Sequence, residues 1–588
     1  MKRKPWGGFL LTLVLAVCLS LLPTTARADE THSHAVCGTT CPEEANHGGH
    51  GEAVDFQARY YDTATKELVC GDNKPSGKNR EGKYAINSGK YYLNADMTLD
   101  APLLIDALED VTICLNGHSI TVNADESVIA IAGRGKLTLC DCQDGALNPD
   151  GSKKEGGKIT HGTKPGSSEK YTYTGCGVQV NYNATFTMYG GSVTGNTVSG
   201  NGNMGAGVDV GSSTNFAMYG GKVTENTMSG SGGQGAGIRT VGGAIIGGSA
   251  EVSKNEVPNG QGAGIYCSNG NLRIQGKAKI SENKALDGEG GGVYLANATT
   301  RLTISGDAAI TGNTAKNGGG VYTDYGTIVL QNQAAITGNT SVTTVADATD
   351  GMGGVYMEYS TLEVSGYVQV TGNYRKESET SSERKDSNVY IGNYNISVVG
   401  ELKDDARIGV TVHETVLDRI KSNKDYSQPI ATATTADWIR EGSFTHDGGT
   451  GNGLYGIRVN DEGTQAELRH DHVWTITVSS ARHTFSESCS SCGEAGGSVT
   501  LTEPAPNVGE KMVYDGSTVW RPTVTTTGKL HTSVTYSGTY RCVWMDGDRE
   551  TALGWNDDAA WRNAGHYTVI MEGGGKTDKI QYPVDRRD

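Results

Sequence analysis

The chain has 588 residues, with 66 acidic against 50 basic side chains and a formal net charge of −16. This length allows several domains, and an acidic balance with no basic run beyond the start of the chain argues against nucleic acid as a partner. Glycine is abundant, at 84 residues, but it recurs at regular intervals, so the chain is not a disordered low-complexity sequence.

Residues 1–28 have the pattern of a secretory signal peptide. Met1-Lys2-Arg3-Lys4 is a basic start, residues 9–22 are apolar, and Ala26-Arg27-Ala28 offers a small-x-small cleavage site. The apolar run is too short for a comfortable membrane span. We therefore expect a protein exported by a bacterium, either secreted or held at the cell surface, with no transmembrane segment after cleavage.

Residues 29–84 show little periodicity but contain many side chains that bind metals. Six lie within 19 residues: His32, His34, Cys37, Cys41, His47 and His50. Zinc is one reading of this cluster, and disulfide formation in an exported protein is the other.

A four-residue motif recurs every 27 to 34 residues through the middle of the chain. It consists of glycine, an aliphatic residue, a variable residue and a mostly apolar one, and its copies begin at Gly177, Gly207, Gly237, Gly264, Gly292, Gly320 and Gly354. An eighth copy has Asn388 in place of the glycine. A repeat this short cannot close a core of its own, so neighbouring copies must stack to bury one.

Each copy contains three short segments in which apolar residues alternate. In the copy that begins at Gly292 these are Val293 with Leu295, Leu302 with Ile304, and Ile310. Alternation at a period of two predicts strands with one buried face. Residues 85–415 are therefore expected to form a right-handed parallel β-helix, with three strands in each coil and coils about 4.8 Å apart.

The third strand of each coil is followed by an asparagine. Asparagine tolerates a left-handed corner, and its amide can bond to the same group one coil away. We expect a structural ladder of stacked side chains at one corner, formed by Asn196, Asn226, Asn255, Asn283, Asn313, Asn339 and Asn373.

These repeats resemble those of a known group of exported proteins. Tyr189-Gly190-Gly191-Ser192-Val193 beside Gly195-Asn196-Thr197, recurring with Gly-Gly-Gly-Val-Tyr, is similar to the repeats of polymorphic outer-membrane and adhesin-type β-helix proteins. The resemblance to β-helix surface proteins exported by gut Firmicutes is greater, and residues 111–120 are similar to their first coils. The resemblance covers roughly residues 85–415, and it implies a shared scaffold more than a shared chemistry.

A column of tyrosines is the first candidate binding site. The third residue of the motif is expected to point out of one sheet on successive coils, at Tyr266, Tyr294, Tyr322, Tyr356 and Tyr390. Such a strip would suit stacking against sugar rings or a protein partner. The alternative is that stacked like residues only stabilise the sheet.

Acidic residues on the same face are the second candidate. Asp324 and Glu358 are expected on neighbouring coils, at a spacing that fits a retaining glycosidase or a Ca²⁺ site, and Asp209 lies at an outward position of an earlier coil. A polysaccharide lyase or glycoside hydrolase is therefore one alternative. Solvated surface charge is the other reading of these residues.

The remaining segments follow the coil. Residues 416–469 are expected to cap it or link it onward. In residues 470–499, His470 and His472 with Cys489 and Cys492 can supply four tetrahedral zinc ligands, with a Cys489–Cys492 disulfide as the rival. In residues 500–588, the segment from Asn563 to Val569 resembles a strand of bacterial immunoglobulin-like modules, which implies a small β-sandwich, complete or truncated.

Taken together, these features indicate an exported β-helix protein that acts as an adhesin or a glycan- or host-surface-binding scaffold without catalysis. The alternatives are a carbohydrate-active enzyme that uses Asp324, Glu358 and Asp209, and a passive structural rod. The sequence leaves the oligomeric state open.

Overall fold

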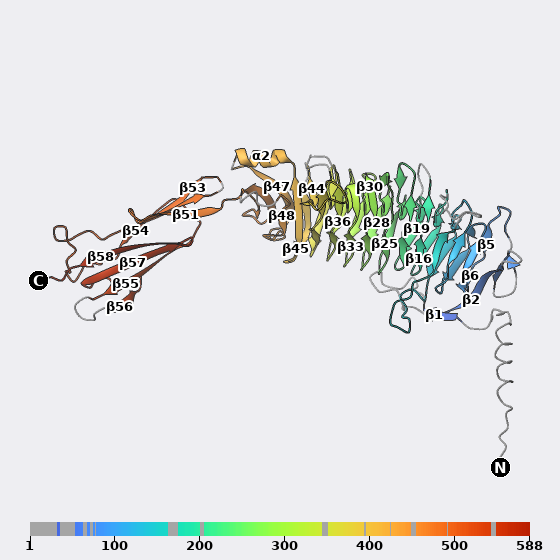
Figure 1. Ribbon diagram of the computed structural model, residues 1–588, viewed down its shortest axis with the longest axis horizontal. Coiled ribbons are helices and arrows are strands. Elements are labelled where there is room, and N and C mark those ends of the chain that lie inside the picture. Colours follow the sequence, from blue (N-terminus) through green and yellow to red (C-terminus); the bar gives the residue numbers. More distant parts are fainter. Residues whose placement is uncertain are drawn as a thin grey trace, which may run out of the picture. The chain divides into compact units, whose positions relative to one another are not determined.

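The computed structural model of the chain describes four strands before residue 77 and most of the chain after it (Figure 1). From residue 78 on, all residues are described except 163–173, 200–204, 344–350, 393–394, 424, 449–453, 491, 543–548 and 588. The signal peptide, Cys37, Cys41, His47 and His50 lie outside the described residues. His32 and His34 belong to a described strand, β1 (His32–Ala35), whose side chains lie outside the description.

The middle of the chain is a coil of stacked parallel strands. In one coil, Val293 pairs in register with Val321 of the next, Leu302 with Ile328, and Ile310 with Ile336. All six side chains are fully buried, as the alternating pattern predicted. The prediction of an all-β fold built on a parallel β-helix is therefore confirmed.

Each coil contributes the same three strands. The first strands are β5 (Tyr84–Ile86), β8 (Leu103–Ile105), β11 (Ile129–Ile131), β14 (Val178–Val180), β18 (Val208–Val210), β23 (Ile238–Thr240), β27 (Ile265–Cys267), β31 (Val293–Leu295), β35 (Val321–Thr323), β39 (Val355–Met357) and β44 (Val389–Ile391). The middle strands are β6 (Gly89–Leu93), β9 (Asp110–Cys114), β12 (Lys136–Cys140), β15 (Thr185–Met188), β19 (Asn215–Met218), β24 (Gly243–Ile246), β28 (Asn271–Ile274), β32 (Arg301–Ile304), β36 (Thr327–Leu330), β40 (Thr361–Gly366) and β45 (Ile396–Leu402). The third strands are β7 (Met97–Leu99), β10 (Ile120–Val122), β13 (Lys158–His161), β16 (Ser192–Thr194), β20 (Lys222–Thr224), β25 (Glu251–Ser253), β29 (Lys279–Ser281), β33 (Ala309–Thr311), β37 (Ala335–Thr337), β41 (Gln369–Thr371) and β46 (Arg407–Val412).

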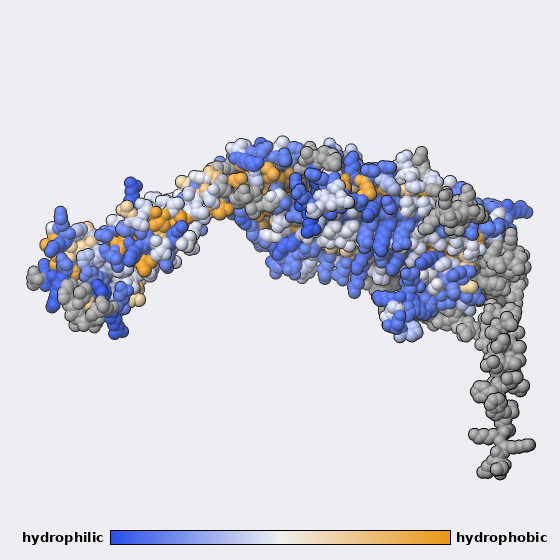
Figure 2. All heavy atoms as spheres, in the orientation of Figure 1, coloured by the Kyte–Doolittle hydropathy of each residue, from blue (hydrophilic) through white to orange (hydrophobic). Residues whose placement is uncertain are grey.

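Several coils add a short fourth strand that the sequence pattern did not predict. These strands stack in parallel into a sheet of their own, formed by β22 (Gly233–Gln234), β26 (Gly260–Gln261), β30 (Lys284–Glu289), β34 (Thr314–Asn317), β38 (Thr340–Val342) and β42 (Tyr374–Lys376). At its edge, β43 (Lys385–Asp386) pairs antiparallel with β42. Figure 2 shows rows of hydrophilic side chains across the visible face of the coil, as expected when equivalent positions of successive coils stack.

Parallel stacking extends beyond the expected limits of 85 and 415. At the start, β2 (Ala53–Asp62) pairs in parallel with β6. At the other end, β45 pairs with β47 (Ser427–Ala433) and β46 with β48 (Phe444–His446). The helix α2 (Glu414–Ser422) lies between β46 and β47 in the sequence. Residues expected to cap the coil therefore also supply further strands of it.

The C-terminal residues form two antiparallel four-stranded sheets. The first sheet contains β51 (Trp474–Ser479), β52 (Thr484–Cys489), β53 (Ala495–Thr502) and β54 (Thr523–Thr527), and the second contains β55 (Val534–Arg541), β56 (Glu550–Leu553), β57 (Gly565–Gly573) and β58 (Lys576–Val584). One apolar core unites them and includes Phe485, Val499, Trp520, Trp561 and Tyr567. This C-terminal module therefore begins near Trp474 rather than at residue 500, so the His/Cys segment is continuous with it.

Among the residues that the structure describes, no helix is both long enough and apolar enough to cross a membrane.

Candidate functional site

The tyrosine column lies in register along the first strands but is mostly buried. Successive ring centroids from Tyr266 to Tyr390 are 5.4, 5.2, 4.8 and 5.9 Å apart, with planes within 10° of parallel. Tyr266, Tyr294 and Tyr322 are only 7–8% exposed. Since each ring face packs against the next ring, little ring surface is open to a ligand, and the binding role expected for Tyr266, Tyr294, Tyr322, Tyr356 and Tyr390 stays a prediction.

The hydroxyl groups of the column bond to neighbouring polar side chains. Gln234, on the fourth strand of an earlier coil, donates to the Tyr266 hydroxyl at 3.1 Å, and the Tyr322 hydroxyl donates to Asp324 at 2.9 Å. Burial, together with the charges of Glu289 and Asp324, raises the pKa of Tyr322 well above its usual value. These contacts favour the structural interpretation of the column over ring stacking with a ligand.

Of the three acidic candidates, Asp209 is isolated from the others. Its carboxylate lies 3.1 Å from Arg239 and accepts the Gly205 N–H at 3.0 Å, in a largely buried setting. Burial raises the pKa of Asp209, and the two partners partly offset that rise. Asp209 is four coils before the Tyr322 coil, about 19 Å away. It therefore cannot act on the same substrate bond as Asp324.

Asp324 and Glu358 occupy the corner after the first strand on neighbouring coils. The strands before them pair Thr323 with Met357, and the Tyr359 N–H donates to the Asp324 carbonyl at 2.7 Å. Within the described residues, these two carboxylates gather no third acidic, histidine or cysteine side chain into a metal-sized group. The calcium interpretation thus has the carboxylates of Asp324 and Glu358 as its acidic donors in this part of the chain, whereas Ca²⁺ usually takes six to eight oxygen ligands.

Sequence reasoning missed a third carboxylate near this corner. Glu289 accepts a hydrogen bond from Gln261 at 3.2 Å and lies close enough to Tyr322 to raise its pKa. Burial raises the pKa of Glu289 itself. Because Glu289 belongs to the unforeseen fourth strand, nothing in the motif placed it beside Asp324.

An exposed pair of tyrosines lies directly beside the two corner carboxylates. Tyr325 and Tyr359 are 53% and 51% exposed, and their rings stack at 5.5 Å with an angle of 12° between them. Sequence reasoning missed this pair as well. Its signal is the repeated hexapeptide of glycine, valine, tyrosine, any residue, an acid and a second tyrosine, at 320–325 and 354–359.

The asparagine ladder is continuous along the buried corner. In each step, the backbone N–H and Nδ2 of one asparagine donate to Oδ1 of the next, at 2.9–3.1 Å, from Asn196 through Asn226, Asn255, Asn283, Asn313 and Asn339 to Asn373. The left-handed backbone lies one residue earlier than expected. Glu225, Lys254 and Glu282, each directly before an asparagine, have φ of 54–56°.

Four candidate zinc ligands meet at the start of the C-terminal module. The ligand atoms of His470, His472, Cys489 and Cys492 lie within 4.8 Å of one another. Both cysteines are present as thiols, so the rival disulfide is not formed in this structure. The upstream set from His32 to His50 cannot be compared with it, because the side chains of that segment are outside the described residues.

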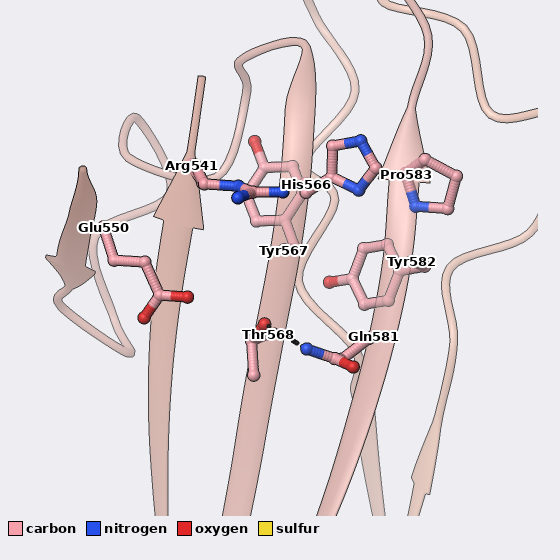
Figure 3. A pocket seen from close by; sticks show the side chains of 8 residues that line it. All are labelled: Arg541, Glu550, His566, Tyr567, Thr568, Gln581, Tyr582 and Pro583. Carbon is pink, nitrogen blue, oxygen red and sulfur yellow. Dashed lines mark hydrogen bonds between the residues drawn. The ribbon is translucent and has the colours of Figure 1, made fainter. Parts of the chain in front are cut away.

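Figure 3 shows side chains that line a polar hollow at the second C-terminal sheet. The volume of the hollow is about 370 Å³. Its lining includes the core residues Tyr567 and Tyr582, and Gln581 donates to the Thr568 hydroxyl at 3.0 Å within it. The rim carries Arg541, Glu550 and His566. Sequence reasoning did not single out this hollow because its lining comes from four different strands.

Comparison with known protein families, curated proteins and solved structures found no match to this chain. What the protein does is therefore inferred from its own side chains.

Proposed function

We propose that this protein is a non-catalytic binding scaffold, exported to the bacterial surface or its surroundings, and that its ligand is a glycan. The observation that carries the proposal is the exposed Tyr325–Tyr359 pair beside Asp324 and Glu358. Sugar rings stack their C–H faces on aromatic rings, and carboxylates accept hydrogen bonds from sugar hydroxyls. Because these residues follow directly after paired parallel strands, their backbone is ordered before a ligand binds, which lowers the entropy lost on binding.

The signal-peptide pattern of residues 1–28 supports export, and the resemblance to adhesin-type repeats supports a surface role. The buried tyrosine column has a supporting part in this proposal. Tyr322 packs beneath the corner and donates to Asp324, which fixes the direction of that carboxylate.

The test is binding of the purified mature chain to a glycan array and to immobilised plant and host polysaccharides. The double variant Tyr325→Ala/Tyr359→Ala should bind any positive glycan at least about tenfold more weakly, or about 1.4 kcal/mol. The matched control is Tyr182→Ala, because Tyr182 occupies the same position after its own motif and is 60% exposed. Unchanged binding by the double variant, or no glycan bound at all, would reject the proposal. The latter result would favour the passive rod.

A carbohydrate-active enzyme is the second candidate, favoured by one observation. Burial raises the pKa of Glu289, which interacts with the Tyr322 hydroxyl that donates to Asp324, and a carboxyl of raised pKa near a second carboxylate is the arrangement used in glycoside hydrolysis. Release of new reducing ends or unsaturated uronates by the wild-type chain, abolished in Glu289→Gln/Asp324→Asn, would establish this alternative. We expect neither product.

A further inference from the structure

We propose that His470, His472, Cys489 and Cys492 bind one structural zinc ion at the start of the C-terminal module. The inference is independent of glycan binding. Their four ligand atoms lie within 4.8 Å of one another. Bonds of about 2.0 Å to nitrogen and 2.3 Å to sulfur place tetrahedral zinc ligands about 3.3–3.8 Å apart, so a contraction of about 1 Å closes the site.

Local backbone structure brings the two cysteines to one side of a turn. Cys489 ends β52, and its carbonyl accepts the Gly493 N–H at 2.8 Å, while its own N–H donates to the Glu494 carbonyl at 2.8 Å. Gly493 has a φ of 73°, a left-handed conformation that glycine adopts readily. The chain therefore reverses directly after Cys492 and directs both thiols toward the same point.

Strand pairing brings the histidines to this turn. β50 (Gln465–His470) ends at His470, and β51 begins at Trp474, which pairs with Cys489 across the hairpin. The Ser490 N–H donates to the Val473 carbonyl at 2.9 Å, which joins the segment between the histidines and β51 to the cysteine turn.

The buried nitrogens of His470 support a role as a metal ligand. Its ring is buried, and neither ring nitrogen has a hydrogen-bond partner among the described residues. Each buried nitrogen that lacks a hydrogen-bond partner destabilises the folded state. A metal bond to one nitrogen removes that cost for the group that binds.

The two ring nitrogens of His472 face different groups, as they do in many metal-binding histidines. Its Nδ1 lies 3.6 Å from the Cys492 sulfur, while its Nε2 lies 3.7 Å from a carboxylate oxygen of Glu494. A histidine that binds zinc through one nitrogen commonly directs the other at a carboxylate, which fixes its tautomer. Nδ1 is thus the expected metal-binding atom, and Glu494 the residue that positions the ring.

The donor set selects the ion. Two thiolates and two imidazoles match structural zinc, whereas Ca²⁺ and Mg²⁺ prefer oxygen. The two thiolate charges balance Zn²⁺, so the buried site is neutral. With four protein ligands the coordination sphere is full, which indicates a structural role rather than a catalytic one.

The experiment compares metal content in variants of the full mature chain grown with added zinc. Elemental analysis should show that Cys489→Ser/Cys492→Ser contains one zinc fewer per chain than wild type. The controls Cys542→Ser and His566→Ala should retain all of it, and Cys37→Ser/Cys41→Ser measures any zinc held by the upstream cluster. Equal zinc in wild type and Cys489→Ser/Cys492→Ser would overturn the proposal.

A second measurement does not depend on a folded variant. The wild-type chain reconstituted with Co²⁺ should show a thiolate-to-cobalt charge-transfer band and the visible bands of a tetrahedral site, and zinc should displace them. Alkylation without reduction, followed by peptide mass analysis, should label Cys489 and Cys492 only after chelation. A Cys489–Cys492 disulfide in the purified protein, or octahedral cobalt without charge transfer, would overturn the proposal.

Discussion

Asn373 donates two hydrogen bonds to the side-chain oxygen of Asn388, one from its backbone N–H at 3.0 Å and one from Nδ2 at 2.9 Å. Asn388 in turn donates its backbone N–H and its Nδ2 to the Asp447 carboxylate, at 2.7 and 2.6 Å. The irregular eighth copy of the motif, with asparagine in place of glycine, thus continues the ladder. The ladder ends at Asp447, because an ionised carboxylate accepts hydrogen bonds and has no N–H group to donate to a further coil.

Removing one asparagine from the middle of the ladder should destabilise the coil. Asn283→Ala leaves the two donors of Asn255 without an acceptor in a buried corner. We expect a loss of about 2–4 kcal/mol in the free energy of unfolding, measured by chemical denaturation with circular dichroism. Asn297→Ala, in an exposed turn of the following coil, is the matched control and should cost much less. Equal losses would mean that the ladder adds nothing specific.

Asp447 should make the stability of the coil depend on pH. Burial raises the pKa of its carboxyl above 3.8, despite the donors from Asn388 and Thr411. The folded state therefore holds this proton more tightly than the unfolded state, so its contribution to stability falls as pH rises from about 4 through the raised pKa.

Asp447→Asn removes the buried charge, but its amide places an NH2 group where one of the two carboxylate oxygens accepts from Asn388. The test is therefore the pH trend: the stability of the variant relative to wild type should fall as pH falls from about 7 toward 4. Denaturation midpoints across this pH range measure it. A relative stability that rises as pH falls would show that the ionised carboxylate is the favoured form.

Truncating a ring in the buried column should cost far more than truncating an exposed one. Tyr294 is 8% exposed and packs between Tyr266 and Tyr322, so Tyr294→Ala should lower the free energy of unfolding by about 3 kcal/mol. Tyr325→Ala should change it by less than about 1 kcal/mol, because half of that side chain already contacts water. The same denaturation assay compares them. If both variants lost the same stability, the column would not be a structural element.

Chelation should loosen the C-terminal module while leaving the coil intact. Tryptophan fluorescence reports mainly on the module because, after the signal peptide, only Trp438 precedes it. Trp474 stacks between His472 at 4.9 Å and His531 at 4.2 Å, so loss of zinc should change its emission directly. We expect a lower melting temperature by fluorescence and an unchanged one by the β-sheet signal of the coil. Trp474→Phe should abolish the early change in emission.

The sequence alone was sufficient for the coil. Apolar residues such as Val293, Leu302 and Ile310 lie at alternating positions of each short segment, and equivalent residues recur at a nearly constant spacing. Both features are visible in the sequence without any knowledge of tertiary contacts. Cysteine and histidine identities also marked the zinc candidates, because few side chains bind a soft divalent ion. The ladder asparagines were recognisable from their position, since each follows the third strand of its coil at a fixed offset.

The tertiary structure decided which faces stay open. The tyrosines of the column are buried because ring packs on ring and because the short fourth strand places Gln234 and Glu289 near their hydroxyl groups. The sequence pattern did not predict that strand because it carries no apolar alternation. Tyr325 and Tyr359 are exposed because they stand at a corner that no other strand covers in the described coil. Periodicity is local information carried by one copy of the repeat, whereas exposure depends on what neighbouring coils place beside it. The periodicity of the sequence therefore determined the β-helix, whereas the packing of neighbouring coils determined which side chains are exposed to a ligand.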